Sequence, residues 1–120
     1  NSGRHFWSRG ASGGRADGFV SGTAWGAYSP ATGIFSGGTV NTNAHLVIIT
    51  FATAAEIVVD GTQVATDSGS ASLSGHTLAS EPGGGSPWAG YIAFAGLYNG
   101  TLTSGQKADL LAWAQDHYGV

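Results

Sequence analysis

Along most of the chain, hydrophobic residues occur in short runs separated by glycine, a pattern that predicts β-strands rather than helices. The clearest run is His45–Phe51, in which apolar residues fill both alternating positions of an extended strand. This pattern is typical of a central strand that is covered on both faces. The runs 56–59 and 62–65 follow it. They are joined by Asp60 and Gly61, a dipeptide that favours a hairpin with a type I′ turn.

Weaker runs extend the pattern on either side of this hairpin. Strands are predicted at 6–7, 18–20, 25–28, 34–35 and 90–98, the last of them long. Residues 82–87 contain only Pro, Gly and Ser and are expected to form a loop. Many short strands with turn signals between them predict an antiparallel sandwich or barrel.

The C-terminal segment has a different period, which indicates a helix. Thr103 and Gln106 have the spacing of a capping box with Thr103 as the N-cap, and Gly119 is expected to end the helix. One helical face is formed by Leu110, Trp113, Ala114 and His117. Such a helix would cover a sheet face or edge. The predicted fold class is therefore all-β: an antiparallel two-sheet β-sandwich with one short C-terminal α-helix.

The hairpin Val58–Ala65 reads Val-Val-Asp-Gly-Thr-Gln-Val-Ala and resembles the "VDG" hairpin of concanavalin A-like lectin/glucanase domains, which include laminin G-like modules. A loop with Gly and Trp then leads into 90–99, followed by Leu-Thr-Ser-Gly-Gln at 102–106 and Trp-Ala-Gln-Asp-His-Tyr-Gly at 113–119. This order is similar to the closing strand and helical tail of many such domains.

The resemblance covers roughly residues 44–120. It implies a two-sheet jelly roll that often binds sugars, often with calcium. Domains with this tail are frequent in bacteriophage structural proteins and in bacterial surface proteins. The resemblance therefore implies a location in a virion or outside the cell, although a fold alone does not fix a function.

The length and composition narrow the picture further. The 120 residues fit one domain, 1–120. Because the chain lacks Met, it is expected to be a processed product, a fragment or the ordered part of a longer polypeptide. Charged residues make up only 9% of the chain, against about 25% in typical soluble domains. Such a surface is common in proteins that pack against neighbours or work outside the cell.

Charge and cysteine content exclude several classes of protein. Four basic and seven acidic residues give a net charge of −3, whereas nucleic-acid binding needs a basic patch, so no nucleic-acid partner is expected. The absence of Cys excludes disulfides and Cys-based zinc sites. No apolar run approaches the ~20 residues of a membrane span, so no membrane insertion is expected.

No catalytic residue is predicted, and the chain is not expected to be an enzyme. Glucanases of the resembled family cluster their carboxylates on one strand. Here Asp60 lies in the predicted turn, and Asp109 and Asp116 lie on the predicted helix. Residues 10–14 match G-x-S-x-G but lack the helix that a nucleophile elbow needs. Residues 104–107 match S-x-x-K, but the companion motifs of that site are missing. The predicted start of a helix already explains these four residues.

Three aromatic residues are the candidate ligand-binding groups: Trp88, Tyr28 and Trp25. Trp88 follows the 82–87 loop, and a loop aromatic beside polar groups can stack on a sugar ring. For Trp25 and Tyr28, packing in a core or an interface is the favoured alternative.

No metal ligand or cofactor is assigned from the sequence. The histidines have no metal-ligand spacing. Calcium stays an open alternative, since loop carboxylates and carbonyls can bind it, with Asp17, Asp67 and Glu81 as loop candidates.

Two functions follow from these observations. The first is a structural module of a virion, in a phage tail, fibre or capsid decoration, which packs on neighbouring proteins or on itself, with surface glycan adhesion as an added role. The alternative is a carbohydrate-binding, lectin-like domain of a secreted or surface bacterial protein. A lectin should lose ligand binding when Trp88 is changed to Ala, whereas an assembly domain should expose an apolar patch.

Overall fold

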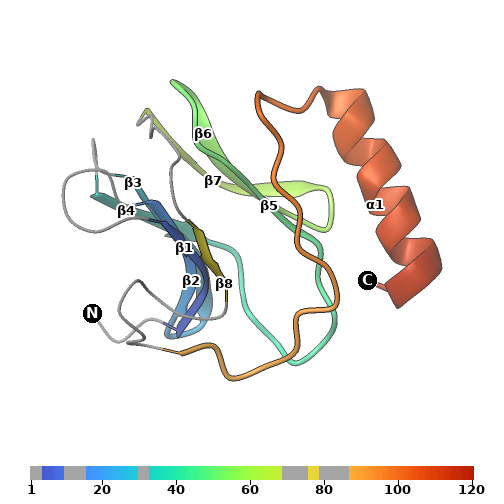
Figure 1. Ribbon diagram of the computed structural model, residues 1–120, viewed down its shortest axis with the longest axis horizontal. Helices are drawn as coiled ribbons and strands as arrows, with labels where there is room; N and C mark the ends of the chain where they lie inside the picture. Colours follow the sequence, from blue (N-terminus) through green and yellow to red (C-terminus); the bar gives the residue numbers. More distant parts are fainter. Residues whose placement is uncertain (1–3, 10–15, 30–32, 69–75, 79–86) are drawn as a thin grey trace.

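A computed structural model of the protein describes residues 4–9, 16–29, 33–68, 76–78 and 87–120. These residues form two antiparallel β-sheets and a C-terminal helix, as the sequence predicts (Figure 1). The strands are β1 (Arg4–Arg9), β2 (Ala16–Ser21), β3 (Ala24–Ser29), β4 (Gly33–Gly37), β5 (Val47–Thr50), β6 (Ala55–Val59), β7 (Thr62–Asp67) and β8 (His76–Leu78), and the helix is α1 (Ser104–Tyr118).

The larger sheet has the strand order β4-β3-β2-β1-β8. Strands β1 to β4 are neighbours in sequence and pair antiparallel with one another. Strand β8 pairs antiparallel with β1, so the chain returns to this sheet after it has formed the smaller one. This return pairs strands that are far apart in the sequence and ties the two halves of the chain together.

The smaller sheet has the order β5-β6-β7, and its β6–β7 hairpin confirms the predicted turn. Asp60 has φ 48° and Gly61 has φ 80°, so both central turn residues lie in the left-handed region that a type I′ turn requires. Asp tolerates this region better than most residues, and Gly enters it without steric cost.

The position of β5 differs from the prediction. The run His45–Phe51 was expected to be a central strand, but β5 is an edge strand of the smaller sheet and β6 is the central one. Val47 and Ile49 pack against the core, whereas Ile48 pairs with Val58 and shares its opposite face. The apolar residues at alternating positions thus show that side chains pack on both faces of β5. They do not show whether β5 has a hydrogen-bonded strand on one edge or on both.

The hydrophobic core lies between the two sheets. Its buried members are Trp25, Ala27, Phe35, Ala55, Ile57 and Val59. Full burial of a large apolar side chain such as Ile57 contributes about 1.5–3 kcal/mol to stability. At one side of the sandwich β4 and β7 approach closely, because a Cβ added to Gly37 would lie 2.0 Å from the carbonyl oxygen of Val64.

Helix α1 begins and ends where the sequence predicts. Thr103 accepts a hydrogen bond from the Gln106 backbone and Gln106 accepts one from the Thr103 backbone, which completes the capping box. Gly119 ends the helix in the left-handed conformation with φ 66°. The helix lies on the outer side of the smaller sheet (Figure 1). No helix in the described part of the chain is long and apolar enough to cross a membrane.

The predicted long strand at 90–98 is wrong. These residues form no strand and are mostly exposed. A strand needs hydrogen bonds from a neighbouring strand, and neither sheet includes this segment among the described residues. Trp113, which lies on the predicted helical face, is half-buried and packs its ring on Phe94 of this segment with centroids 5.1 Å apart.

Candidate functional site

The aromatic residues predicted to bind a ligand do not form one site. Trp25 is only 6% exposed and belongs to the core, which agrees with the core alternative. Trp88 is partly buried, its ring meets the edge of Phe6 at 5.7 Å, and its indole nitrogen is buried. Tyr28 is half-buried in β3 and pairs across the sheet with Asp17. The sugar-binding role of Trp88 and Tyr28 stays a prediction.

The calcium candidates are also separated. Asp17 is buried in β2 of the larger sheet, and Asp67 ends β7 in the smaller sheet, where its Oδ1 accepts the Ser68 N–H at 2.7 Å. Glu81 lies outside the described residues. Across the ranges that the structure describes, no three His, Cys, Asp or Glu side chains gather as metal ligands.

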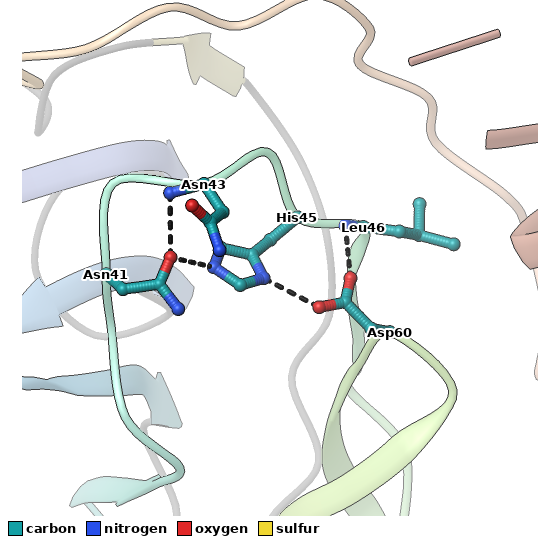
Figure 2. A network of polar contacts seen from close by, with 5 residues as sticks. All are labelled: Asn41, Asn43, His45, Leu46 and Asp60. Atoms are coloured by element: carbon teal, nitrogen blue, oxygen red, sulfur yellow. Dashed lines mark hydrogen bonds and ion pairs between the residues drawn. The ribbon is translucent and has the colours of Figure 1, made fainter. Parts of the chain in front are cut away.

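A polar network joins the segment before β5 to the β6–β7 turn (Figure 2). The Asp60 carboxylate accepts the Leu46 N–H at 2.8 Å, and its second oxygen lies 2.6 Å from His45 Nδ1. His45 Nε2 lies 2.9 Å from Asn41 Oδ1, which also accepts the Asn43 N–H at 2.7 Å. The Asp60 N–H donates in turn to the Leu46 carbonyl at 3.0 Å.

The donors and acceptors of this network can be assigned from its geometry. The Asn43 N–H directs the oxygen of the Asn41 amide toward the imidazole. His45 therefore faces an acceptor at each ring nitrogen, and both contacts are hydrogen bonds only when both nitrogens carry a hydrogen. The Asp60 carboxylate oxygen lies 2.6 Å from Nδ1 and accepts a hydrogen bond when this nitrogen carries the hydrogen.

This network, here called the clamp, links the β6–β7 turn to the segment before β5. A carboxylate on His Nδ1 is the arrangement that orients a catalytic base. Here, however, the other nitrogen contacts the amide of Asn41, which is not a nucleophile. The imidazole also meets the edge of Trp25 at 5.5 Å, so the clamp packs on the core. Its chemistry fixes the hairpin relative to the segment that enters β5.

A second polar contact fixes α1 to the outer face of the smaller sheet. Lys107 of α1 forms an ion pair with Glu56 of β6, and both side chains are less than one-fifth exposed. The Thr50 hydroxyl also donates to Glu56 at 3.2 Å. Beside this pair a groove of about 290 Å³ lies between α1 and the sheet, with Val58, Gln63 and Leu111 among its lining residues. The two opposite charges balance each other, so the groove has no net charge.

A third pair of polar side chains, His5 and Asp17, is buried on the face of the larger sheet that points away from the core. A Cβ at Gly18 would face Phe6 and Ile49 in the core, so Asp17 beside it points to the opposite face. There Asp17 Oδ2 lies 3.8 Å from His5 Nε2, and each side chain is at most 2% exposed. This distance is longer than a hydrogen bond.

Five large apolar side chains of the segment before α1 and of its last turn are exposed, and this set is here called the aromatic face. It consists of Tyr91, Phe94, Leu97, Tyr98 and Tyr118, whose exposures are 103%, 50%, 61%, 57% and 42%. Trp113 connects its two parts, because its ring lies 5.1 Å from Phe94 and 5.4 Å from Tyr118. Phe94, Trp113 and Tyr118 thus form one aromatic cluster that joins the segment before α1 to the last turn of the helix.

Comparison with known proteins finds no matching family model, no similar curated protein and no similar solved structure. The functional argument therefore depends on the chain's own residues.

Sequence reasoning placed His45 at the start of a strand and Asp60 in a turn, and it missed both their contact and the aromatic face. The polar alternation Asn41, Asn43, His45 before a buried strand is a signal that could have indicated the clamp. The aromatic face was hidden because Tyr91 and Leu97 fit a strand pattern, and a strand would have buried part of them.

Proposed function

We propose that this chain is a non-enzymatic binding module that acts through protein–protein assembly, as a structural part of a virion or an extracellular particle. The observation that carries this proposal is the aromatic face. Large apolar side chains are usually buried, and a contiguous apolar patch marks an interaction site. An assembly domain was expected to expose such a patch, whereas a lectin was expected to bind through Trp88.

The size of the aromatic face supports the proposal. Free aromatic side chains present roughly 150–250 Å² each, so the five exposed side chains leave on the order of 600 Å² open to solvent. The largest apolar patch of a typical monomer is about 300–600 Å² and is often functional. Single exposed apolar residues are normal on a protein surface. Ile34, which lies on β4 of the larger sheet, is one of them and needs no such explanation.

The architecture is in accord with the concanavalin A-like resemblance, and we propose a trimmed jelly roll of that kind. Two features support it: a core between two antiparallel sheets, and the return of β8 to pair with β1 after the smaller sheet. The Val-Asp-Gly turn and the C-terminal helix, two of the motifs that carry the resemblance, also support it, whereas residues 90–98 do not form the closing strand that the resemblance implies.

A photocross-linking experiment tests the assembly proposal. Leu97 is replaced by benzoylphenylalanine in the full natural polypeptide, expressed in its native setting and irradiated. Leu97 suits this change because it is 61% exposed. The control places the same group at Ile34, which is 49% exposed on β4 of the larger sheet.

Covalent adducts to a protein chain that form at Leu97 and not at Ile34 would support the proposal. Equal adducts at the two positions, or none at Leu97, would contradict it. A glycan array with the Trp88→Ala variant runs in parallel. Saturable binding that this variant loses would favour the lectin-like alternative.

A further inference from the structure

The dipeptide Asn99-Gly100 lies in the segment before α1, and both of its residues are exposed. We propose that Asn99 is a site of spontaneous deamidation, which in time adds a negative charge to the chain next to Tyr98. The modification follows from the chemistry of the chain itself. Its effect on binding, described below, rests on the proposed assembly function.

The reaction needs only the two residues and water. The backbone nitrogen of Gly100 gives up its proton and attacks the side-chain amide carbon of Asn99. A carbon–nitrogen bond forms and the amide nitrogen leaves as ammonia, so the intermediate is a cyclic imide. Water then opens the imide at either carbonyl, and the product is aspartate or isoaspartate. Water is consumed and ammonia is released, without oxidation or reduction.

Gly100 leaves the path of attack open. A Cβ beside the attacking nitrogen would hinder its approach, and glycine has none. Gly100 has φ 135°, a conformation that glycine adopts at no steric cost, and the chain bends at this dipeptide outside any strand or helix. A Cβ built on Gly100 would lie 3.5 Å from the Tyr98 ring, an ordinary contact distance. The ring therefore borders the site without filling it.

The reacting groups of Asn99 and Gly100 are also unrestrained. Within the part of the chain that the structure describes, neither the Asn99 amide nor the Gly100 N–H takes part in a hydrogen bond or an ion pair. Residues 93–101 are all exposed. A segment with few backbone hydrogen bonds and little burial rearranges at low cost in free energy. The side chain and the backbone nitrogen can therefore reach the geometry of attack.

Two other dipeptides in the sequence could form the same imide, and the structure restrains both. Asp17 precedes Gly18 in β2, where its side chain is only 1% exposed. Asp60 precedes Gly61 in the β6–β7 turn, where its carboxylate accepts the Leu46 N–H at 2.8 Å. An aspartate that passes through the imide also gains no charge, so neither position changes the charge of the chain.

The other asparagines of the described residues lack one or more of these features. Asn41 belongs to the clamp, where its Oδ1 accepts the Asn43 N–H at 2.7 Å. It precedes Thr42, whose branched side chain crowds the attacking nitrogen. Asn43 precedes Ala44, which carries a Cβ. Asn99 alone among the three combines exposure, the lack of hydrogen bonds and a following glycine.

Deamidation would add a charge to a stretch of the chain that has none. No Asp, Glu, Lys or Arg occurs between Glu81 and Lys107, and one more carboxylate changes the net charge from −3 to −4. Asn99 directly follows Tyr98 and is two residues from Leu97, both members of the aromatic face. A partner that contacts these side chains would remove water from the new carboxylate without pairing it, which opposes binding.

Peptide mapping by mass spectrometry tests the modification on the purified chain, kept at mildly alkaline pH, where the Gly100 nitrogen loses its proton more readily. Aspartate and isoaspartate at position 99 should accumulate at least roughly tenfold faster than at Asn41 or Asn43, a difference of about 1.4 kcal/mol in activation free energy. Electron-transfer fragmentation distinguishes the two products. The Asn99→Gln chain, which keeps an amide, is the control and should show no comparable gain of charge.

A synthetic peptide with the sequence of residues 96–102 gives the rate without the fold. The folded chain should deamidate at Asn99 at a rate within roughly tenfold of this peptide, because the fold does not restrain the site. A greater slowing in the folded chain would overturn the inference, and so would equal rates at Asn99 and Asn41.

A second measurement separates the modification from its effect on assembly. Asn99→Asp is introduced into the full polypeptide that carries benzoylphenylalanine at position 97, and Asn99→Gln is the uncharged control. The Asp variant should give several-fold fewer adducts than the Gln variant. Equal yields would overturn the effect on assembly, while deamidation measured on the purified chain would stand. If position 97 gives no adducts even with Asn99 intact, the assembly function itself is wrong.

Discussion

The clamp around Asp60 leads to a specific stability prediction. The Asp60→Gly change removes the carboxylate and keeps the turn, since Gly adopts φ 48° without strain. It deletes the hydrogen bond from the Leu46 N–H at 2.8 Å and the contact with His45 Nδ1 at 2.6 Å. Both partners are then left without their acceptor in a half-buried position.

The magnitude follows from these two contacts. Hydrogen bonds to a charged group contribute about 1.5–3 kcal/mol each. Asp60 is 33% exposed and His45 is 12% exposed, so water replaces part of each bond and the lower limit applies. We expect Asp60→Gly to lower the free energy of unfolding by about 2–3 kcal/mol, which corresponds to a fall in Tm of about 10 °C for a domain of this size.

Two further variants separate the causes. Asp60→Asn keeps an acceptor for the Leu46 N–H and tolerates the left-handed region, so the expected loss is about 1 kcal/mol. Asp60→Ala loses the carboxylate and also strains the turn, because Ala lacks the short polar side chain that lets Asp and Asn occupy the left-handed region, which otherwise costs about 1–2 kcal/mol. The expected order of stability is therefore wild type, Asn, Gly, Ala.

Urea unfolding followed by tryptophan fluorescence measures these differences at constant m-value. A double-mutant cycle with His45→Ala isolates the Asp60–His45 contact, with an expected coupling of about 1–2 kcal/mol. An Asp60→Gly chain with the urea midpoint of the wild type would refute the reasoning, and so would an Asn variant less stable than the Gly variant. Zero coupling would show that the Asp60–His45 contact does not stabilise the fold.

Three further changes test other parts of the fold. Gly37→Ala should destabilise by about 3 kcal/mol in urea, since its Cβ would lie 2.0 Å from the backbone oxygen of Val64; an unchanged midpoint would disprove the close approach of β4 and β7. Thr103→Ala should lower Tm, measured by far-ultraviolet circular dichroism, through the loss of about 1 kcal/mol of helix capping, whereas Thr103→Ser should not. Glu56→Gln should cost about 1–2 kcal/mol in urea, since Lys107 loses its ionic partner; equal stability would show that solvent replaces that pair.

The sequence by itself determined the features that depend on a few adjacent residues. The Asp60-Gly61 turn follows from the conformations that these two residues tolerate. The limits of α1 follow from the capping box at Thr103 and from Gly119, because both act within one helical turn. The division into β-strands followed by one helix follows from the change in hydrophobic period.

Only the tertiary structure decided which strands are neighbours and which residues meet. The apolar run around Ile48 shows that both of its faces are covered, but the edge position of β5 depends on hydrogen bonds to distant segments. His45 and Asp60 are 15 residues apart and meet because the β5–β6 pairing brings the two ends together.

The aromatic face was also decided at this level. Residues 90–98 have the side chains of a strand, but a strand exists only where another strand accepts its backbone bonds, and the described sheets do not. Leu97 and Tyr98 therefore remain at the surface. Local pattern measures how well a residue suits burial, whereas burial itself depends on what the rest of the chain brings to cover it.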